Sequence, residues 1–295
     1  MSEFSSALLS SDENQPGGLS PFCRGDARPK ACEGRLPIDS ARSRIRRTLC
    51  LMDGPSRDGA IETRRLSKKF GALEALRGLD LAVPRGESVA LFGPNGAGKT
   101  TLIRVLTLAL EPSGGRLSIG GLDPRTDADR IRRSIGVISH QSHLYAELSS
   151  RENLEFFGAL YGVRQPGRRA EELLELVKLS RRADDPLGTL SHGMRQRISL
   201  ARALVHDPPI VFMDEPFTGL DPHAARILRQ TLERLRREGR TVLFVTHNLT
   251  EGLELSDRWL LLFAGRIVEQ GASSSTDRSG FEALYFDRVA AARSA

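Results

Sequence analysis

The chain has 295 residues, of which 39% are hydrophobic and 27% are charged, as is ordinary for a globular protein. This length allows one large domain or two modest ones. The net charge of +6 permits contact with nucleic acid or with an anionic membrane surface, but it requires neither. No uninterrupted apolar run reaches the roughly 18–20 residues that span a bilayer, which excludes a membrane channel. The first residues lack a signal peptide's apolar core, so we expect a cytoplasmic protein.

The first 57 residues differ from everything that follows. They contain no Val, Trp or Tyr and are rich in Ser, Gly, Pro and Arg. Such a segment cannot bury enough apolar surface to offset its ordering entropy, so we predict a disordered N-terminal extension over 1–57. Cys23, Cys32 and Cys50 fit no zinc-binding pattern and are interpreted as incidental thiols. Met52 precedes the first patterned segment, which suggests the hypothesis that translation begins there.

From about residue 59 the pattern becomes α/β, with apolar runs of strand length alternating with amphipathic helices. Strands are predicted at 61–66, 76–83 and 88–92, followed by helices at 100–110, 127–135 and 169–179. A strand at 210–213, a helix at 223–238, and strands at 241–245 and 259–263 come next, and a last helix is predicted at 281–292. No internal repeat is visible, so we expect one nucleotide-binding unit.

A glycine-rich segment lies between the apolar strand at 88–92 and the helix after it. Its sequence, GPNGAGKTT, matches G-x-x-x-x-G-K-[ST], in which backbone N–H groups surround phosphate oxygens and the helix dipole points at them. The lysine is expected to reach the β- and γ-phosphates of ATP, and the threonine hydroxyl after it to bind Mg²⁺. The predicted phosphate-binding residues are Gly93, Pro94, Asn95, Gly96, Ala97, Gly98, Lys99, Thr100 and Thr101.

Two later strands end in polar side chains suited to hydrolysis. The strand at 210–213 ends in Asp214 and Glu215. Asp214 suits the Mg²⁺ shell, and Glu215 is placed to orient and deprotonate the attacking water. The strand at 241–245 ends before His247, which can donate to the γ-phosphate, because the carboxyl ends of parallel strands hold the ligand.

The segment LSHGM at 190–194 resembles the signature motif of ABC ATPases, usually written LSGGQ. Other motifs of that family occur in its order over about residues 59–270. The resemblance implies that Phe70 stacks on adenine, that Gln141 belongs to the glutamine loop, and that Ser191 and Gly193 form the signature. Gln141 would then touch Mg²⁺, as a metal ligand beside Thr100 and Asp214 and as a member of the catalytic set with Glu215 and His247. Residues 93–101 resemble Walker A, 214–215 Walker B, 219–221 the D-loop and His247 the switch histidine.

Two departures from the family pattern concern the signature and the D-loop. His192 and Met194 stand where Gly and Gln are commonest, and the D-loop reads Thr-Gly-Leu-Asp in place of Ser-Ala-Leu-Asp. The serine hydroxyl and the helix terminus remain, while the fine signature contacts are put in doubt.

The signature should serve a second subunit. A helix over 193–206, at about 1.5 Å per residue, would set Ser191 roughly 20 Å from the Walker B strand. We therefore expect it to grip a γ-phosphate only across the interface of a head-to-tail dimer, as a homodimer or a heterodimer.

The resemblance also implies a fold and an assembly with a membrane protein. The fold is an α/β P-loop NTPase core with a mixed sheet, an antiparallel β-subdomain and an inserted α-helical subdomain at about 141–195. The ATPase domain spans 58–270, and 271–295 is a linker with a C-terminal helix. Its partner is an integral membrane permease, which places the chain on the cytoplasmic face of the cell membrane.

The cargo is less specified. The segment around 141–161 resembles exporter ATPases. The segments at 215–221 and 246–252 are similar to the ATPase of the haem exporter used in cytochrome c maturation. An exporter of drugs, lipids or polysaccharides is the main alternative. A non-transport ABC ATPase is another, although one ATPase unit without coiled-coil heptads argues against ribosomal and DNA-repair types, so no nucleic acid is expected.

Overall fold

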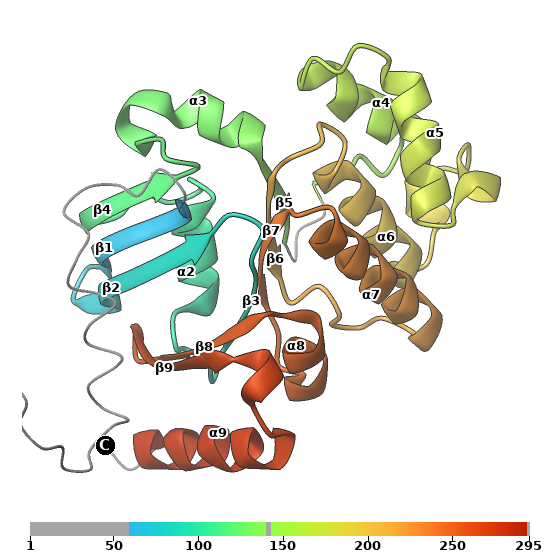
Figure 1. Ribbon diagram of the computed structural model, residues 1–295. Helices are drawn as coiled ribbons and strands as arrows, with labels where there is room; N and C mark the ends of the chain where they lie inside the picture. The colour runs from blue at the N-terminus through green and yellow to red at the C-terminus, as the bar shows by residue number, and fades with distance from the viewer. Residues whose placement is uncertain (1–58, 140–142, 294–295) are drawn as a thin grey trace, which may run out of the picture. The chain divides into compact units, whose positions relative to one another are not determined.

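The computed structural model describes residues 59–139 and 143–293, which belong to one compact unit (Figure 1). The predicted N-terminal extension, the three cysteines and Gln141 lie outside the described residues. Among the helices within these ranges, none is long and apolar enough to cross a membrane.

A six-stranded mixed sheet forms the core, with the strand order β5-β6-β7-β3-β8-β9. The first five strands of this order pair in parallel, and β9 pairs antiparallel with β8. Every residue of β3, β6 and β7 is buried, as expected for parallel strands covered on both faces. The strands are β3 (Ser88–Phe92), β5 (Ile135–Ile138), β6 (Ile210–Asp214), β7 (Thr241–Val245), β8 (Arg258–Phe263) and β9 (Arg266–Ala272).

Side chains of this sheet alternate between two apolar cores, because successive residues of a strand face opposite sides. On β3, Val89 and Leu91 belong to the core that α2 (Lys99–Leu106) covers, together with α3 (Pro124–Ser134). Ala90 and Phe92 belong to the core on the other side, which includes residues of the C-terminal helix described below and of five other helices. These are α4 (Ser150–Leu160), α5 (Pro166–Leu176), α6 (His192–Ala203), α7 (Pro222–Arg237) and α8 (Leu249–Leu255).

A separate three-stranded antiparallel sheet, in the order β2-β1-β4, packs on the α2 side (Figure 1). Its strands are β1 (Gly59–Phe70), β2 (Leu73–Pro84) and β4 (Gly114–Ile119). The helices α4, α5 and α6 lie between β5 and β6 in the chain. A capping box fixes the start of α4, where Ser149 and Glu152 exchange side-chain and backbone hydrogen bonds. The predicted mixed core, antiparallel subdomain and inserted helices are thus confirmed.

Several predicted helix boundaries were wrong. The helix expected at 127–135 begins at Pro124, where Asp123 caps it, and ends before Ile135, which opens β5. The helix expected at 100–110 ends at Leu106, and Leu108 has a φ of 59°. The helix expected at 169–179 is α5, which ends at Leu176, and Lys178 has a φ of 57°. Left-handed backbone cannot continue a helix, so these two ends are set by conformation, not by loss of the apolar pattern.

The C-terminal helix α9 (Arg278–Arg293) is longer at both ends than the predicted 281–292. It follows β9 through a short 3-10 turn, Ser273–Ser275. Its one fully buried side chain among those described, Phe281, joins the core on the α8 side of the sheet.

Candidate nucleotide site

The loop between β3 and α2 is closely enclosed by other backbone. Gly93 has a φ of 154°, and a Cβ there would lie 2.3 Å from the carbonyl oxygen of Leu262. Gly98 has a φ of 104°, and its Cβ would lie 2.6 Å from the carbonyl oxygen of Ala75. Neither space admits a side chain, so both positions require glycine. The loop therefore has the conformation that presents backbone N–H groups at the start of α2.

Lys99 is the first residue of α2 and is only 7% exposed. Its ammonium donates to the carbonyl oxygens of Gly93 at 2.6 Å and Pro94 at 3.0 Å. Burial lowers the pKa of Lys99, and the charges of Glu215 and Asp214 partly oppose that shift. The predicted phosphate lysine and the two predicted carboxylates are thus brought close together.

Asp214 is the last residue of β6 and Glu215 follows it, at the edge of the sheet where β3 also ends. Asp214 is 4% exposed, and its Oδ1 has no hydrogen-bond partner among the described residues. Glu215 has a φ of 54°, a strained conformation for a residue with a Cβ, and its N–H donates to the Val245 carbonyl at 3.1 Å. This bond to β7 fixes the glutamate in place despite the strain.

His247 lies directly opposite Glu215. Its Nε2 lies 2.8 Å from Oε1 of Glu215. The two atoms are in close contact, but they are not aligned as a hydrogen bond. The side chain of His247 is 52% exposed, whereas that of Glu215 is 9% exposed. A half-exposed imidazole beside a buried carboxylate can reach a ligand from the solvent side while the carboxylate acts from inside.

Phe70 ends β1 and lies near the same loop. It pairs with Leu73 across the β1–β2 turn, two residues before Ala75, whose carbonyl closes over Gly98. Its ring is 46% exposed, with the Lys68 ammonium 5.3 Å from the ring centroid. An exposed aromatic face next to the phosphate loop suits stacking on a base.

The signature residues lie at the start of α6 and contact the D-loop. Ser191 is exposed and caps α6 by accepting the Met194 N–H at 3.3 Å. A Cβ on the buried Gly193 would lie 3.0 Å from Oδ2 of Asp221. Asp221 in turn caps α7, and the N–H of Ala224, with a further N–H from His223, lowers the pKa of its carboxyl group.

We predicted that the length of α6 places Ser191 far from the Walker B strand, and this prediction was wrong. Gln196 of α6 donates to the carbonyl of Pro216 at 3.5 Å, just beyond Glu215. At the far end, His206 Nε2 lies 3.0 Å from the carbonyl of Ile135, the first residue of β5. The helix therefore runs back along the sheet, and its length does not carry Ser191 away from the end of β6.

What separates the two predicted anion sites, at the starts of α2 and α6, is the sheet itself. The apolar side chains of α2 pack in one core and those of α6 in the other, on opposite faces of the six strands (Figure 1). Ser191 and Lys99 consequently begin helices that lie on different sides of the sheet.

The remaining predicted residues divide into three groups. Asn95, Gly96 and Thr100 are exposed in or next to the loop, Pro94 and Thr101 are partly buried, and Ala97 is buried. Thr100 follows Lys99, so its hydroxyl lies at the same helix start. Gln141 lies outside the described residues. Within the described ranges, no group of three or more His, Cys, Asp or Glu side chains is arranged to hold a metal ion.

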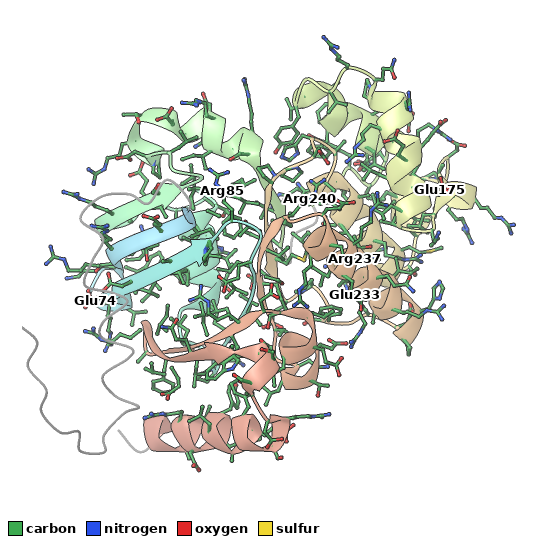
Figure 2. The ribbon with its side chains drawn as sticks, viewed as in Figure 1. Glu74, Arg85, Glu175, Glu233, Arg237 and Arg240 are labelled. Carbon is green, nitrogen blue, oxygen red and sulfur yellow. The ribbon has the colours of Figure 1, made fainter. Side chains whose placement is uncertain are left out.

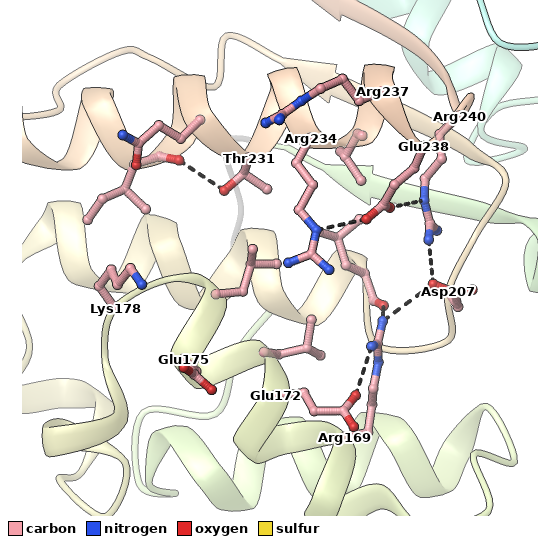
Figure 3. Close-up of a pocket in the computed structure, with 16 residues that line it drawn as sticks. Arg169, Glu172, Glu175, Lys178, Asp207, Thr231, Arg234, Arg237, Glu238 and Arg240 are labelled. Carbon is pink, nitrogen blue, oxygen red and sulfur yellow. Dashed lines mark hydrogen bonds and ion pairs between the residues drawn. The ribbon is translucent and has the colours of Figure 1, made fainter.

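A hollow of about 550 Å³ lies elsewhere, between α5 and α7 (Figure 3). Ion pairs line it: Asp207 contacts Arg240 at 2.6 Å and Arg169 of α5 at 3.5 Å, and Glu238 contacts Arg234 at 2.7 Å along the end of α7. None of the predicted nucleotide-binding residues lines it. Charged side chains of both helices line it, among them Glu175 and Arg237, which Figure 2 also labels. We interpret this region as a charged surface that ties α5 to the core.

Some contacts of the site were missed in the sequence. The Gly265 N–H donates to the carbonyl of Ala97 at 2.9 Å, so the β8–β9 turn supports the phosphate loop. Ala75 supports it from β2. Both act through backbone atoms, which leave no residue-type signal. Thr218 donates to Glu215 Oε2 at 3.5 Å, and its position three residues later could have indicated it.

Comparisons with known proteins agree with this geometry. The family model described as ABC transporter matches residues 76–218. A daunorubicin resistance ATP-binding protein of Streptomyces coeruleorubidus is 41% identical over 73% of this chain and 69% of its own length. The ABC transporter ATP-binding protein NatA of Bacillus subtilis is 36% identical over 72% of this chain and 88% of its own. A Nod factor export ATP-binding protein of Burkholderia lata is 39% identical over 72% of this chain and 70% of its own length.

Solved structures are similar over the same region. An ATP-binding subunit of an ABC transporter is 31% identical, with a TM-score of 0.72, over 78% of this chain and 99% of that one. An ATP-binding cassette solved as a post-hydrolysis dimer bound to ADP and Pi is 28% identical, with a TM-score of 0.67. The match covers 72% of this chain and 98% of that one. One conclusion explains the buried lysine of the glycine loop, the two carboxylates at the end of β6 and the capped helix α6. This chain belongs to the ABC transporter family as an ATP-binding subunit that hydrolyses ATP.

Proposed function

We propose that the chain drives export through a separate membrane permease, as one of two ATPase subunits that clasp ATP between them. The contact between His247 and Glu215 is the observation that carries the catalytic part. His247 follows β7, which neighbours β3, and Glu215 follows β6, the next strand of the sheet. With Lys99 of the phosphate loop, these side chains come from three segments far apart in the sequence, and each is held by a strand end or by hydrogen bonds to the backbone.

In the proposed reaction, Glu215 orients a water molecule and takes its proton as the water oxygen attacks the γ-phosphorus. The bond between that phosphorus and the β–γ bridging oxygen breaks, and ADP leaves with the electron pair. His247 donates a hydrogen bond to a γ-phosphate oxygen and holds the reacting groups in line. Lys99 exchanges its bonds to loop carbonyls for bonds to phosphate oxygens.

Mg²⁺ fits the residues present. Oδ1 of Asp214 is buried and unpartnered within the described ranges, as an acceptor reserved for a cation or its water would be. Thr100 would add a hydroxyl ligand, and Gln141 an amide oxygen. When bound, the ion would supply charge neutralisation for the phosphates.

A dimer follows from the position of the two anion sites on opposite faces of the sheet. The start of α6, with Ser191 as its cap, can bind a γ-phosphate only when that phosphate is held on another copy's Lys99. A head-to-tail pair would bury two ATP molecules, and loss of the γ-phosphates would let it reopen. The dimeric cassette among the similar structures supports this arrangement.

The permease would dock on the aromatic surface of the helical subdomain. Tyr145 and Phe156 form an edge-to-face pair at 5.3 Å, and they are 48% and 44% exposed. Leu160 and Tyr161 on the same helix end are 69% and 37% exposed. Clustered exposed apolar side chains mark interaction sites, and this cluster adjoins the segment that contains Gln141. The chain would then act at the cytoplasmic face of the membrane.

Export as the direction draws support from relatives named for daunorubicin resistance and for Nod factor export. Those names favour a drug, lipid or oligosaccharide cargo. Haem export stays a prediction from sequence resemblance, and none of the relatives reported above is named for it. A non-transport role is the second class, and it predicts stimulation by nucleic acid or ribosomes in place of binding to a membrane protein.

The catalytic proposal is tested with Glu215→Gln. The variant should keep ATP but lose turnover by roughly 10²–10⁴-fold, the usual share of a general base, and should accumulate as an ATP-bound dimer. Light scattering after size exclusion and phosphate release would measure both. Glu175→Gln, at an exposed position of α5, is the control. Turnover at the wild-type rate in Glu215→Gln would remove this residue as the base.

The permease proposal is tested by affinity purification from detergent-solubilised membranes. The double variant Phe156→Ala, Leu160→Ala should lose a co-purifying integral membrane protein and keep basal ATP hydrolysis. Val268→Ala, at a 40% exposed apolar position on β9, should lose nothing. Retention of the membrane protein by the double variant would contradict the docking surface.

A further inference from the structure

The C-terminal helix α9 packs on the last residue of β3. Asp277 precedes α9 and accepts the Gly280 N–H at 2.9 Å, which fixes the helix start. Phe281 is 2% exposed, and its ring centroid lies 5.0 Å from that of Phe92 and 4.7 Å from that of Trp259. Phe92 directly precedes Gly93 of the phosphate loop. A helix at the end of the ATPase domain thus reaches the strand that leads into the nucleotide site.

The same Phe92 ring supports α8 from another side. A Cβ on Gly252 of α8 would lie 2.2 Å from Phe92 Cζ, so the helix and the ring are in direct contact. α8 and α9 also contact each other. Any loosening of α9 therefore leaves Phe92 and α8 without one of the surfaces that hold them.

The position of α8 determines that of His247. Asn248 caps α8 by accepting the Glu251 N–H at 3.1 Å, and His247 is the residue immediately before this cap. The side chain of His247 is half-exposed, and Glu215 is its contact across the site. With little packing of its own, the imidazole depends on α8 for its distance from the carboxylate.

A second side chain of α9 adds to this contact. Tyr285 lies one turn beyond Phe281 and packs, half-buried, against the same core. Burial, and to a smaller extent the nearby charge of Glu215, raise the pKa of Tyr285. Further along, Arg288 pairs with Glu269 of β9 at 3.1 Å, which holds α9 across the β8–β9 side of the site.

We propose that α9 is a positioning element of the hydrolytic site, in which Phe281 and Tyr285, packed in the core of Phe92 and α8, keep His247 in register with Glu215. This inference rests on the proposed roles of those two catalytic residues. The phosphate loop is held separately, by Leu262, Ala75 and Gly265. Losing the α9 contact should therefore slow the hydrolytic step more than it weakens nucleotide binding.

The first test is Phe281→Ala in the full chain. The chain has one tryptophan, Trp259, which contacts Phe281, so its fluorescence reports whether α9 stays docked. We expect a red-shifted emission, a roughly tenfold fall in kcat and a KM for ATP within about twofold of wild type, because small misplacements of reacting groups act on the rate. Phe281→Leu should restore most of kcat, and Asp287→Ala, an exposed change on the same helix, should match wild type.

Tyr285→Ala is the second test, and it decides the matter if Phe281→Ala does not fold. It should lower kcat severalfold while the emission of Trp259 and the KM for ATP stay unchanged. Wild-type kcat in Tyr285→Ala, or in a folded Phe281→Ala with exposed Trp259, would overturn the inference. Glu215→Gln, assayed in parallel, separates the two claims: if it turns over normally, the proposed base is wrong whatever the α9 variants do.

Discussion

Gly252→Ala provides a sharp test of the packing around the switch histidine. In an ordinary helix this change stabilises a protein by about 0.5–1 kcal/mol, because glycine has more conformational freedom to lose. Here the new Cβ would lie 2.2 Å from Phe92 Cζ and 3.0 Å from Thr246 Cγ2. Carbon atoms prefer separations of roughly 3.5–4.0 Å, so the helix or the ring must move by more than about 1 Å.

Gly252→Ala should therefore destabilise the protein, where the same change in an ordinary helix stabilises it. Overpacking of a core costs about 1–3 kcal/mol, which leaves a net destabilisation of about 1–2 kcal/mol after the helical gain. For a domain of this size the Tm should fall by roughly 3–6 °C. Because the cap of α8, Asn248, is the residue after His247, kcat should fall as well.

The assay is calorimetric unfolding together with ATP turnover. Gly167→Ala in α5 is the matched control, since its Cβ would meet only the flexible end of Glu155 at 3.3 Å. That control should gain stability and keep its activity. If Gly252→Ala is as stable and active as Gly167→Ala, then α8 does not lie against Phe92 in the way that the argument for His247 requires.

Three further changes test the nucleotide contacts. Lys99→Ala should weaken ATP binding by about 10–100-fold or more in titration calorimetry, because charge-assisted hydrogen bonds to phosphate are lost, and normal affinity would count against the phosphate loop. Phe70→Ala should raise the KM for ATP by roughly 5–100-fold, as expected for loss of base stacking, with an unchanged Tm since the ring is 46% exposed. Ser191→Ala removes a helix cap and should cost about 1 kcal/mol in thermal unfolding, and it should also reduce ATP-dependent dimerisation in light scattering, whereas Ser191→Thr should restore both. A Ser191→Ala protein that dimerises normally would refute the signature's role as the second anion site.

Elements with strong local signals were predicted well from the sequence. β3 and β7 have the predicted bounds, because fully buried parallel strands are continuous apolar runs ended by turns. β4, β5 and β9 were not predicted as strands. β4 opens with two glycines, β5 has four residues, and β9 is an edge strand without a buried residue. Their pairing depends on partners far along the chain, and no local pattern records that.

The candidate site shows the same division. Lys99, Glu215 and His247 were predicted because strand ends and a glycine loop can be recognised in the sequence, and the structure brings them together. The enclosure of the loop by Ala75 and the packing of α9 were missed. Backbone carbonyls have no residue-type signal, and the apolar face of α9 indicates only that it packs somewhere.

Phe92 explains why binding and hydrolysis can be supported separately in so small a region. Its backbone belongs to the sheet ladder with Leu261 of β8, and the chain then turns directly into Gly93 and the loop that leads to α2. Its side chain faces the opposite core, against α8 and α9. The main chain of Phe92 therefore leads to the loop and α2 on one side of the sheet, while its ring packs on the other side. The main chain can keep the phosphate loop in place while the ring links the position of α9 to that of His247. A contact on the far face of the sheet can therefore alter the rate of hydrolysis without passing through the residues that hold the nucleotide.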